Sequence, residues 1–442
     1  MAVPGARAYR PRFHYTPDKG WINDPNGLIY DGRQYHLFAQ HNPDDTKWGP
    51  MHWAHAVSDD LLRWQRLPLA LEPDALGMCF SGSAAMVNGQ ICLMYTSHGA
   101  HEQQSVAFSE DGVRFVPWAG NPVIPNEAQR DYRDPKVFWD AARGRYAVAV
   151  AAGDHVEFFA GPDMVHWEKT GEFADQARVS GVHECPDVFP LTAPDGSVVW
   201  VMIASMILPE RTGNRTQYVL GEYDGSAFRM TRPFDAPEWV DAGWCNYALV
   251  TFYGAPEPLA IGWANCWAFA DRLPTGDYAG MMTLPRRLSL ADTKRGLRLA
   301  QQPARTLDAL TGPWHPAADG APLNGECFRL RAHGSAPYAL ELTNGEETLR
   351  VEQTETELIV DARRAGECGA ADELRGERYG LLRAERLTEA QDLELVFDVC
   401  IAEVFADKGV RVATAPVFPT RPYTALRLEG DVRVELAEVE GA

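Results

Sequence analysis

Four copies of a short pattern, an Asp followed four positions later by an aromatic residue, recur along the first half of the chain. They lie in the segments SDDLLRW, SEDGVRF, GPDMVHW and EYDGSAF, and their aspartates, spaced 51, 52 and 61 residues apart, are Asp60, Asp111, Asp163 and Asp224. A nearly fixed period of this length indicates a repeated structural unit, and a four-stranded blade needs roughly 40 to 50 residues. Alternating apolar runs between the copies, such as AVAV at 147–150, fit short strands. The repeat therefore predicts an array of four-stranded β-units.

A second series of polar residues runs at similar spacing. Its members, 57, 53, 50 and 57 residues apart, are Asp24, Ser81, Asp134, Glu184 and Asp241. Five such positions predict a five-bladed β-propeller in which each member opens an innermost strand. All five would then project into one central funnel, which would gather carboxylates that are far apart in sequence. Chance spacing in a β-rich chain is the alternative, and the aromatic-capped repeat disfavours it.

The character of the sequence changes near residue 300. The segment 311–322 is rich in Pro, Gly and Ala, which is typical of a linker. From Glu326 onward, alternating runs such as YALEL at 338–342 and LELVF at 393–397 indicate a β-sandwich. We therefore predict an all-β chain with a five-bladed β-propeller at 1–305, a linker at 306–325 and a C-terminal β-sandwich at 326–442.

Composition restricts the class of partner. At 442 residues the chain is long enough for two domains, and 45% apolar residues describe a folded protein. A net charge of −20 disfavours nucleic acid and anionic membranes as partners. The strongest apolar run, at 198–208, is far shorter than the ~20 residues needed to span a bilayer. We expect a small-molecule substrate, no nucleic-acid or membrane partner, and find no indication of oligomeric state.

Eight cysteines are scattered along the chain, at 79, 92, 185, 245, 266, 327, 368 and 400. They form no CxxC pair or Cys/His cluster, so the sequence predicts neither a metal site nor a redox motif. The N-terminal stretch MAVPGARAYRPRFHY contains no apolar core of a secretory signal. We therefore expect free thiols and a cytoplasmic protein.

The segment WINDPNG at 21–27 holds one carboxylate, Asp24, in a rigid turn. Pro25 fixes φ and the following Asn-Gly tolerates left-handed geometry, so an ordinary turn is the alternative interpretation. Aromatic residues surround the motif, with FHYTP at 13–17 before it and YHLF at 35–38 after it. Aromatic faces stack on the C–H surfaces of sugars, so this surround predicts a sugar-binding floor for Asp24.

The stretch FHYTPDKGWINDPNG at 13–27, followed by HLFAQHNP at 36–43, resembles the signature of glycoside hydrolase family 32, which comprises invertases, fructan hydrolases and sucrose-6-phosphate hydrolases. The motifs FSGS, RDP and ECPD follow at blade spacing, and the C-terminal strands resemble the sandwich of the same family. The resemblance implies that the nucleophile is Asp24, the transition-state stabiliser Asp134 and the acid/base Glu184. It implies no cofactor and no metal.

The same resemblance implies further positions that line a fructose subsite: Asn23, Gln40, Trp48, Phe80, Ser81, Arg133 and Trp263. Arg133, beside Asp134, can hold that carboxylate ionised and donate to substrate hydroxyls. A partly apolar setting near two anions would raise the pKa of Glu184, as an acid requires. The resemblance puts Trp263 and Trp267 near the pocket rim, and core packing is the alternative for both.

One stretch departs from the family pattern. Where members commonly read Asp-x-Gly-x-Asp-Phe-Tyr-Ala, this chain has DAGWCNYA at 241–248, with Cys245 and Asn246 replacing an acid and an aromatic residue. Because Asp241 falls at blade spacing, we expect its strand to border Glu184. A neutral Cys245 would then lower the pKa of Glu184 relative to the family pattern. The alternative is that these side chains only repack the blade.

These features together predict a retaining β-fructofuranosidase that removes terminal non-reducing fructose from sucrose or short fructans by double displacement. A fructosyltransferase shares the same three carboxylates and is one alternative. An inverting five-bladed arabinan-type hydrolase is another, which the WINDPNG motif and the C-terminal sandwich disfavour. A carbohydrate-binding propeller without activity is the third, and the presence of all three carboxylates disfavours it.

Overall fold

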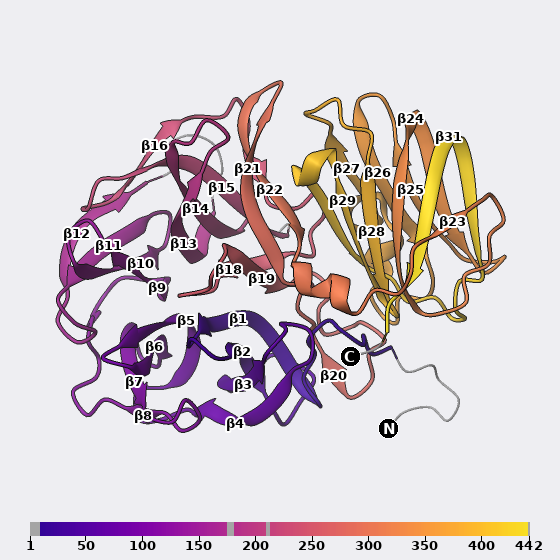
Figure 1. Ribbon diagram of the computed structural model, residues 1–442. Helices are drawn as coiled ribbons and strands as arrows, with labels where there is room; N and C mark the ends of the chain where they lie inside the picture. The colour runs from indigo at the N-terminus through magenta and orange to yellow at the C-terminus, as the bar shows by residue number, and fades with distance from the viewer. Residues whose placement is uncertain (1–8, 175–180, 209–212, 441–442) are drawn as a thin grey trace. The chain divides into compact units, whose positions relative to one another are not determined.

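The computed structural model describes residues 9–174, 181–208 and 213–440, and these are almost entirely β-structure (Figure 1). The all-β prediction is confirmed, with a five-bladed propeller followed by a sandwich-like sheet. The chain forms two compact units. The propeller unit consists of Lys19–Trp239 and Tyr247–Trp263, and the sandwich unit of residues 9–18, 240–246 and 264–440. The domain limits expected at 305 and 326 stay a prediction.

Four blades of the propeller unit are antiparallel sheets whose four strands follow in chain order. They comprise β1 (Gly20–Tyr30), β2 (Tyr35–Asn42), β3 (His52–Ser58), β4 (Gln65–Leu71); β5 (Met78–Val87), β6 (Gln90–His98), β7 (Glu102–Ser109), β8 (Val116–Pro117); β9 (Tyr132–Asp140), β10 (Arg145–Ala152), β11 (Val156–Gly161), β12 (Glu168–Phe173); and β13 (Val182–Thr192), β14 (Val198–Ile207), β15 (Asn214–Tyr223), β16 (Phe228–Arg232). The short strand β17 (Glu238–Trp239) pairs with β15. The fifth blade begins with β18 (Tyr247–Thr251) and β19 (Leu259–Trp263).

The first strands of the five blades meet one another in a closed ring. Strand β1 contacts β5 and β18, strand β9 contacts β5 and β13, and β13 contacts β18 (Figure 1). The apolar cores lie between consecutive blades, where for example Ile29, Trp53 and Leu93 pack together. A ring of this kind brings residues that are some 50 positions apart in sequence to one axis. The expected geometry of innermost strands is thus present.

The four repeated Asp residues have one structural role. Each lies in the turn between the third and fourth strands of its blade, and its Oδ1 accepts hydrogen bonds from the backbone N–H groups two and three positions later; these residues are Asp60, Asp111, Asp163 and Asp224. Asp favours such turns because its short carboxylate mimics a backbone turn. Phe115 and Phe228, which end two of the copies, pack between consecutive blades. The repeat therefore records one turn in each of four blades.

The sandwich unit contains a nine-stranded sheet with the order β27-β26-β25-β24-β28-β29-β30, while β31 pairs with β23 and β24. Its elements are β20 (Tyr278–Ala279), β21 (Arg286–Thr293), β22 (Gly296–Pro303), η2 (Arg305–Ala309), β23 (His315–Ala317), β24 (Cys327–Thr343), β25 (Thr348–Gln353), β26 (Glu357–Arg364), η3 (Asp372–Arg375), α1 (Glu377–Gly380), β27 (Leu381–Glu385), β28 (Leu393–Asp398), β29 (Ile401–Ala406), η4 (Asp407–Gly409), β30 (Arg411–Pro416) and β31 (Ala425–Glu438). Every second residue of β25 is buried, as alternation predicts. The segment expected as a linker holds part of η2 and all of β23.

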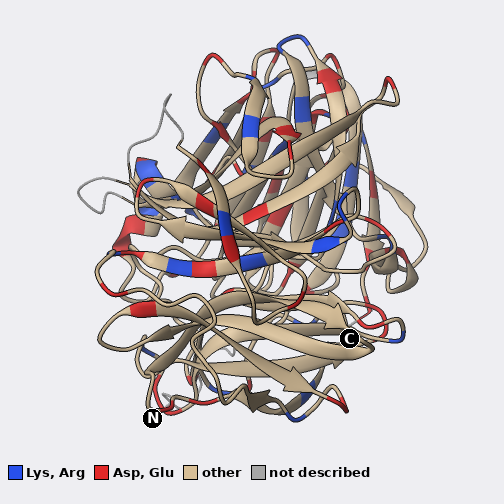
Figure 2. Ribbon diagram, turned by 90° about the vertical axis from the view of Figure 1, so that its left-hand side faces the viewer, with Lys and Arg blue, Asp and Glu red and all other residues tan. Residues whose placement is uncertain are grey.

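Charged residues of both signs are interspersed along the strands in the view of Figure 2. Arg350 of β25 pairs with two acids, since its guanidinium lies 2.7 Å from Glu429 and 3.4 Å from Glu352. All eight cysteines are free and buried, which confirms the prediction of unpaired thiols. Within the described residues, no helix has the length and apolar character that crossing a membrane requires.

A buried ionic network joins the three segments of the sandwich unit. His14 Nδ1 lies 2.8 Å from Asp398 and its Nε2 lies 3.5 Å from Glu403, while Arg286 contacts Glu403 at 3.0 Å and Asp241 at 3.5 Å. Burial opposes the protonated imidazole, but hydrogen bonds and charges from the two acids raise the pKa of His14 to about 9. The sequence predicts His14 in the aromatic surround of Asp24; in the structure it is instead a second cation of this network, beside Arg286.

The raised pKa of His14 predicts a pH-dependent contribution to stability. Because the folded pKa is about 9 and the unfolded value is 6.5, the stabilisation is complete below pH 6.5 and is lost as pH rises through 9. A His14→Gln variant should have a lower unfolding midpoint Tm, and the decrease should be largest below pH 6.5. There the free energy of unfolding should fall by about 3 kcal/mol. Thermal unfolding measured from pH 6 to 9.5 tests this, with His315→Gln on the exposed part of β23 as control. A Tm deficit that does not shrink with rising pH would contradict it.

Candidate active site

The innermost strands are irregular at the level of the predicted site residues. Register shifts interrupt the pairing of all five strands, next to Ile22 and Pro25 in β1, Phe80 and Gly82 in β5, Arg133 and Lys136 in β9, Glu184 and Asp187 in β13, and Tyr247 and Val250 in β18. Such β-bulges bend a strand and re-aim its side chains. In FSGS the bulge requires glycine, because a Cβ on Gly82 would lie 2.0 Å from the carbonyl oxygen of Met94.

Asp24 is buried at the bulge of β1, with 7% of its surface exposed. Its Oδ2 accepts hydrogen bonds from Ser81 Oγ at 2.6 Å and from Gln40 Nε2 at 3.0 Å. Its Oδ1 is buried and accepts no hydrogen bond from the described residues. Burial raises the pKa of Asp24, and the Ser81 hydroxyl opposes that rise. One carboxylate oxygen is thus held by two donors, while the other has no such donor among the described residues.

Asp134 lies beside Asp24, on the bulge of β9. Its backbone N–H donates to Thr96 Oγ1 at 2.9 Å, and its Oδ2 accepts the backbone N–H of Cys185 at 2.9 Å. The Cys185 sulfur lies 3.6 Å from an oxygen of both aspartates. Burial raises the pKa of Asp134 well above its usual range, the charges of Glu184 and Asp24 add to this, and Arg133 opposes it. Burial likewise keeps the Cys185 thiol protonated by raising its pKa, so the S–H can donate to these carboxylates.

Glu184 is held by two donors. Arg133 donates to its Oε1 through Nη2 at 3.0 Å and Nε at 3.2 Å, and the Tyr247 hydroxyl donates to its Oε2. Burial raises the pKa of Glu184, and the charge of Asp24 adds to the rise, while Arg133 and Tyr247 oppose it. The direction expected from the sequence is confirmed.

Arg133 is engaged differently from the expectation. It opposes the pKa rise of Asp134 through its charge, as proposed, but its hydrogen bonds go elsewhere. Its Nη1 donates to Asp131 at 2.8 Å and to both oxygens of Glu102 at 3.1 and 3.2 Å, in addition to the bonds to Glu184. The guanidinium therefore bridges an outer pair of acids and Glu184.

The remaining predicted positions divide into two groups. Asn23 accepts a hydrogen bond from Trp21 Nε1 at 2.8 Å, and Trp48, 45% exposed, lies in a T-shaped contact with Phe80 at 6.0 Å between ring centroids. Trp48 is thus not packed in the core, and its place in a sugar pocket stays a prediction. Trp263, in contrast, is fully buried with its ring 5.7 Å from that of Trp21, so the core alternative describes it.

The prediction for Asp241 is wrong. Asp241 lies outside β18 and belongs to the sandwich unit, where its carboxylate accepts hydrogen bonds from the backbone and hydroxyl of Thr414. Cys245 and Asn246 are buried in the same unit, and β18 begins only at Tyr247. Tyr247, and not Asp241, lies on the innermost strand of the fifth blade and contacts Glu184. The sequence feature that could have identified it is its match to the Tyr of the family pattern. Equal spacing missed it because the approach to the fifth blade is longer.

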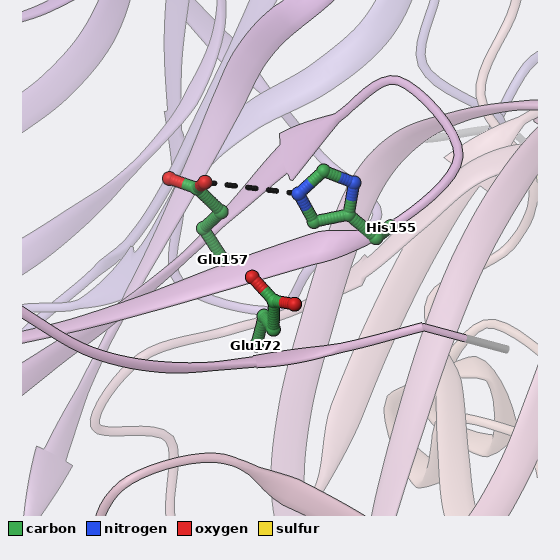
Figure 3. Close-up of side chains that lie close together, drawn as sticks. All are labelled: His155, Glu157 and Glu172. Atoms are coloured by element: carbon green, nitrogen blue, oxygen red, sulfur yellow. Dashed lines mark ion pairs between the residues drawn. The ribbon is translucent and has the colours of Figure 1, made fainter.

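Two further groupings of polar residues lie outside this carboxyl cluster. His155, Glu157 and Glu172 have ligand atoms within 4.8 Å of one another, a grouping that could hold a cation (Figure 3). However, Lys169 Nζ lies 2.6 Å from Glu157 and 3.2 Å from Glu172, so both carboxylates already share an ion pair with one ammonium group.

A groove of about 1410 Å³ in the sandwich unit is lined by residues such as Arg331, Asp392 and Arg433, and it contains none of the predicted site residues. The buried carboxyl cluster is the better candidate for chemistry, because several carboxyl groups with raised pKa are gathered there by separate strands.

Comparison with known proteins decides the family. The model of the glycosyl hydrolases family 32 N-terminal domain matches residues 14–303, and that of the family's C-terminal domain matches residues 323–439. The chain belongs to glycosyl hydrolase family 32. It is therefore a glycoside hydrolase, and the resemblance inferred from its motifs is confirmed.

Relatives of this family 32 chain cover most of its length. A levanase of Bacillus subtilis is 32% identical over 97% of this chain and 69% of the levanase, and an invertase of Schizosaccharomyces pombe is 33% identical over 64% of this chain and 53% of the invertase. The crystal structure of an exo-inulinase from Aspergillus awamori covers 98% of this chain and 99% of its own, with a TM-score of 0.89 and 26% identity.

Proposed function

We propose that this family 32 enzyme is a retaining β-fructofuranosidase that hydrolyses terminal non-reducing β-D-fructofuranosyl residues of sucrose or short fructans. One observation carries the proposal. Two buried carboxyl groups of raised pKa occur in the same cluster: Asp24, of which only one oxygen accepts hydrogen bonds, and Glu184. Relatives named levanase, invertase and exo-inulinase support a fructoside as substrate. No cofactor or metal is part of the proposed chemistry.

In the first step Asp24 acts as the nucleophile on the anomeric carbon. Ser81 and Gln40 hold its Oδ2, and we assign the attack to Oδ1, which accepts no hydrogen bond from the described residues. Glu184 donates its proton to the leaving oxygen, for which its raised pKa is suited. The result is a covalent fructosyl-enzyme ester and a free leaving alcohol.

In the second step Glu184, now ionised, takes a proton from water, which attacks the anomeric carbon and releases Asp24. Arg133 and Tyr247 stabilise the ionised Glu184 through the bonds described above. Asp134 would bind ring hydroxyls as positive charge develops on the sugar, and Arg133 and Asn23 would add donors and acceptors. Trp48 and Phe80 would form the apolar wall of the pocket.

A fructosyltransferase remains the second candidate, since it would use the same carboxylates with a sugar acceptor in place of water. Hydrolysis assays on sucrose, sucrose 6-phosphate, kestose, inulin and levan, with product analysis at high sucrose concentration, separate the two. Oligosaccharides longer than the substrate would favour transfer. If NMR shows that the α-anomer of fructose is released first, the mechanism is not retaining. If none of these sugars reacts, the alternative of a carbohydrate-binding protein without activity is favoured.

A cytoplasmic location is proposed on the cysteines alone. All eight are free and buried, and reducing compartments keep thiols in that state.

Removal of either reacting carboxylate should nearly abolish turnover. We expect Asp24→Ala and Glu184→Ala each to lower kcat on sucrose by about 10²- to 10⁴-fold or more, because no neighbouring group can take over a covalent or proton-transfer step. The Glu184 variant should lose least on an aryl fructoside, whose leaving group needs little protonation. Asp235→Ala on the exposed surface is the control. Near-normal turnover of folded Asp24→Ala, or an equal Glu184→Ala loss on both substrates, would remove the mechanism.

Tyr247 should set the alkaline limit of activity. Its hydroxyl stabilises ionised Glu184, so Tyr247→Phe should raise the pKa of Glu184 and move the alkaline limb of kcat/KM upward by about one pH unit. The pH profile on sucrose measures this. Tyr146→Phe, which removes a hydroxyl bonded to the carbonyl of Met86, should leave the profile unchanged. An unshifted or downward-shifted limb in Tyr247→Phe would contradict this assignment.

A further inference from the structure

His98 lies between the aromatic wall and the acidic partners of Arg133. It is the last residue of β6, and its side chain is 35% exposed. Its ring stacks on that of Phe80 with centroids 3.9 Å apart and an angle of 9° between the planes. Its Nδ1 lies 3.1 Å from Glu102 Oε1. One side chain thus contacts two parts of the proposed site at once.

Glu102 continues the contact inward. Its carboxylate, 12% exposed, accepts the backbone N–H of Tyr132 at 2.7 Å and both bonds from Arg133 Nη1. Burial raises the pKa of Glu102, but the bonds from His98, Arg133 and Tyr132 outweigh it and lower the pKa. Glu102 is therefore ionised, and it binds Nη1 of the same guanidinium whose Nη2 and Nε bind Glu184. Together with Asp131, which also accepts from Nη1, Glu102 thus anchors that end of Arg133.

The strand pairing fixes this arrangement. His98 pairs directly with Glu102 where β6 turns into β7, and Phe80 pairs with Thr96, so His98 lies diagonally across from Phe80 within reach of its ring. Thr96, two residues earlier in β6, accepts the backbone N–H of Asp134. The end of β6 thus supports both the aromatic wall and the carboxyl cluster.

We propose that His98 is a positioning residue with two separable tasks. Its ring face holds Phe80 against Trp48 as the wall of the sugar pocket. Its Nδ1–H holds Glu102, which keeps Arg133 aligned with the acid/base Glu184. The inference rests on the proposed function and deepens it, since neither task requires His98 to touch the reacting atoms. Misalignment of a supporting residue is costly, because catalytic geometry tolerates only about half an ångström.

Two substitutions separate the tasks. His98→Phe keeps a ring against Phe80 but removes the donor to Glu102, whereas His98→Asn keeps a donor but removes the stacked ring. His98→Ala removes both. The control is His101→Ala, an exposed histidine of the same hairpin loop. Each variant is assayed for kcat and KM on sucrose and on an aryl β-fructofuranoside, after circular dichroism and Tm confirm folding.

For His98→Phe we expect kcat on sucrose to fall about fivefold to tenfold with KM within about twofold, because the hydrogen bond that Nδ1 makes to the Glu102 carboxylate is lost. The fall should be smaller on the aryl fructoside, which depends less on the Glu184 proton. For His98→Asn we expect KM to rise about fivefold on both substrates with kcat nearly unchanged, because the aromatic contact is lost. His98→Ala should show both effects, and His101→Ala neither.

If His98→Phe and His98→Asn show the same fall in kcat and the same rise in KM on both substrates, His98 has a merely structural role and the assignment is overturned. Wild-type values in both variants would overturn it as well. If His98→Ala does not fold, the Phe and Asn pair still decides the matter. An enzyme inactive on every β-fructofuranoside overturns the proposed function and this inference together, whereas an active enzyme with insensitive variants overturns only the role of His98.

Discussion

The pairing of Arg133 with Glu184 is the interaction on which the buried carboxyl cluster depends. Asp24, Asp134 and Glu184 are all withdrawn from water, and burial is the main cause of the raised pKa of each. Burying an ionised carboxylate away from water without a partner costs several kcal/mol of free energy, so such a group tends to stay protonated. The charge of Arg133 opposes that cost for all three groups. The acids also repel one another, because the charge of Asp24 helps to raise the pKa of both Asp134 and Glu184.

The blade architecture explains how such a cluster can be assembled from residues far apart in sequence. Each acid arrives on the first strand of a different blade, and these strands meet in one ring. The ring itself needs only apolar packing between blades, so the polar residues at its centre are free to serve chemistry. In this protein the thiol of Cys185 and the hydroxyls of Ser81 and Tyr247 fill that space with donors directed at the carboxylates.

Spacing predicted the blades well because one turn is used again in each. The Asp of that turn must accept two backbone N–H groups, and this local requirement is visible in sequence without tertiary contacts. The same spacing placed Asp24, Ser81, Asp134 and Glu184 on first strands. The roles assigned to them depend on the family resemblance and stay predictions.

Partners across the fold were not predictable from spacing. His14 and Asp241 stand in or near signature motifs, yet both are paired with charged groups more than 40 residues away in the sandwich unit, namely Asp398 and Arg286. Arg133 adjoins Asp134 in sequence, but the bulge of β9 interrupts the regular alternation of side chains there, and the bonds of Arg133 reach Glu184 and Glu102 instead. Trp263 packs in the core for the ordinary reason that a large apolar ring gains most from full burial.

The bulges at the centre of the propeller also carry a cost in the folded state. Asp134, Cys185 and Ala248 have φ angles of 64°, 44° and 53°, a region that residues with a Cβ seldom occupy. Each such residue retains about 1–3 kcal/mol of conformational energy, which the surrounding sheets must supply. A version of this protein selected only for heat resistance would tend to relax these positions first. The pairing of its innermost strands would become more regular, and the side chains that now point into the funnel would point into the blades. Thermal stability would then be gained at the expense of turnover at the same few residues.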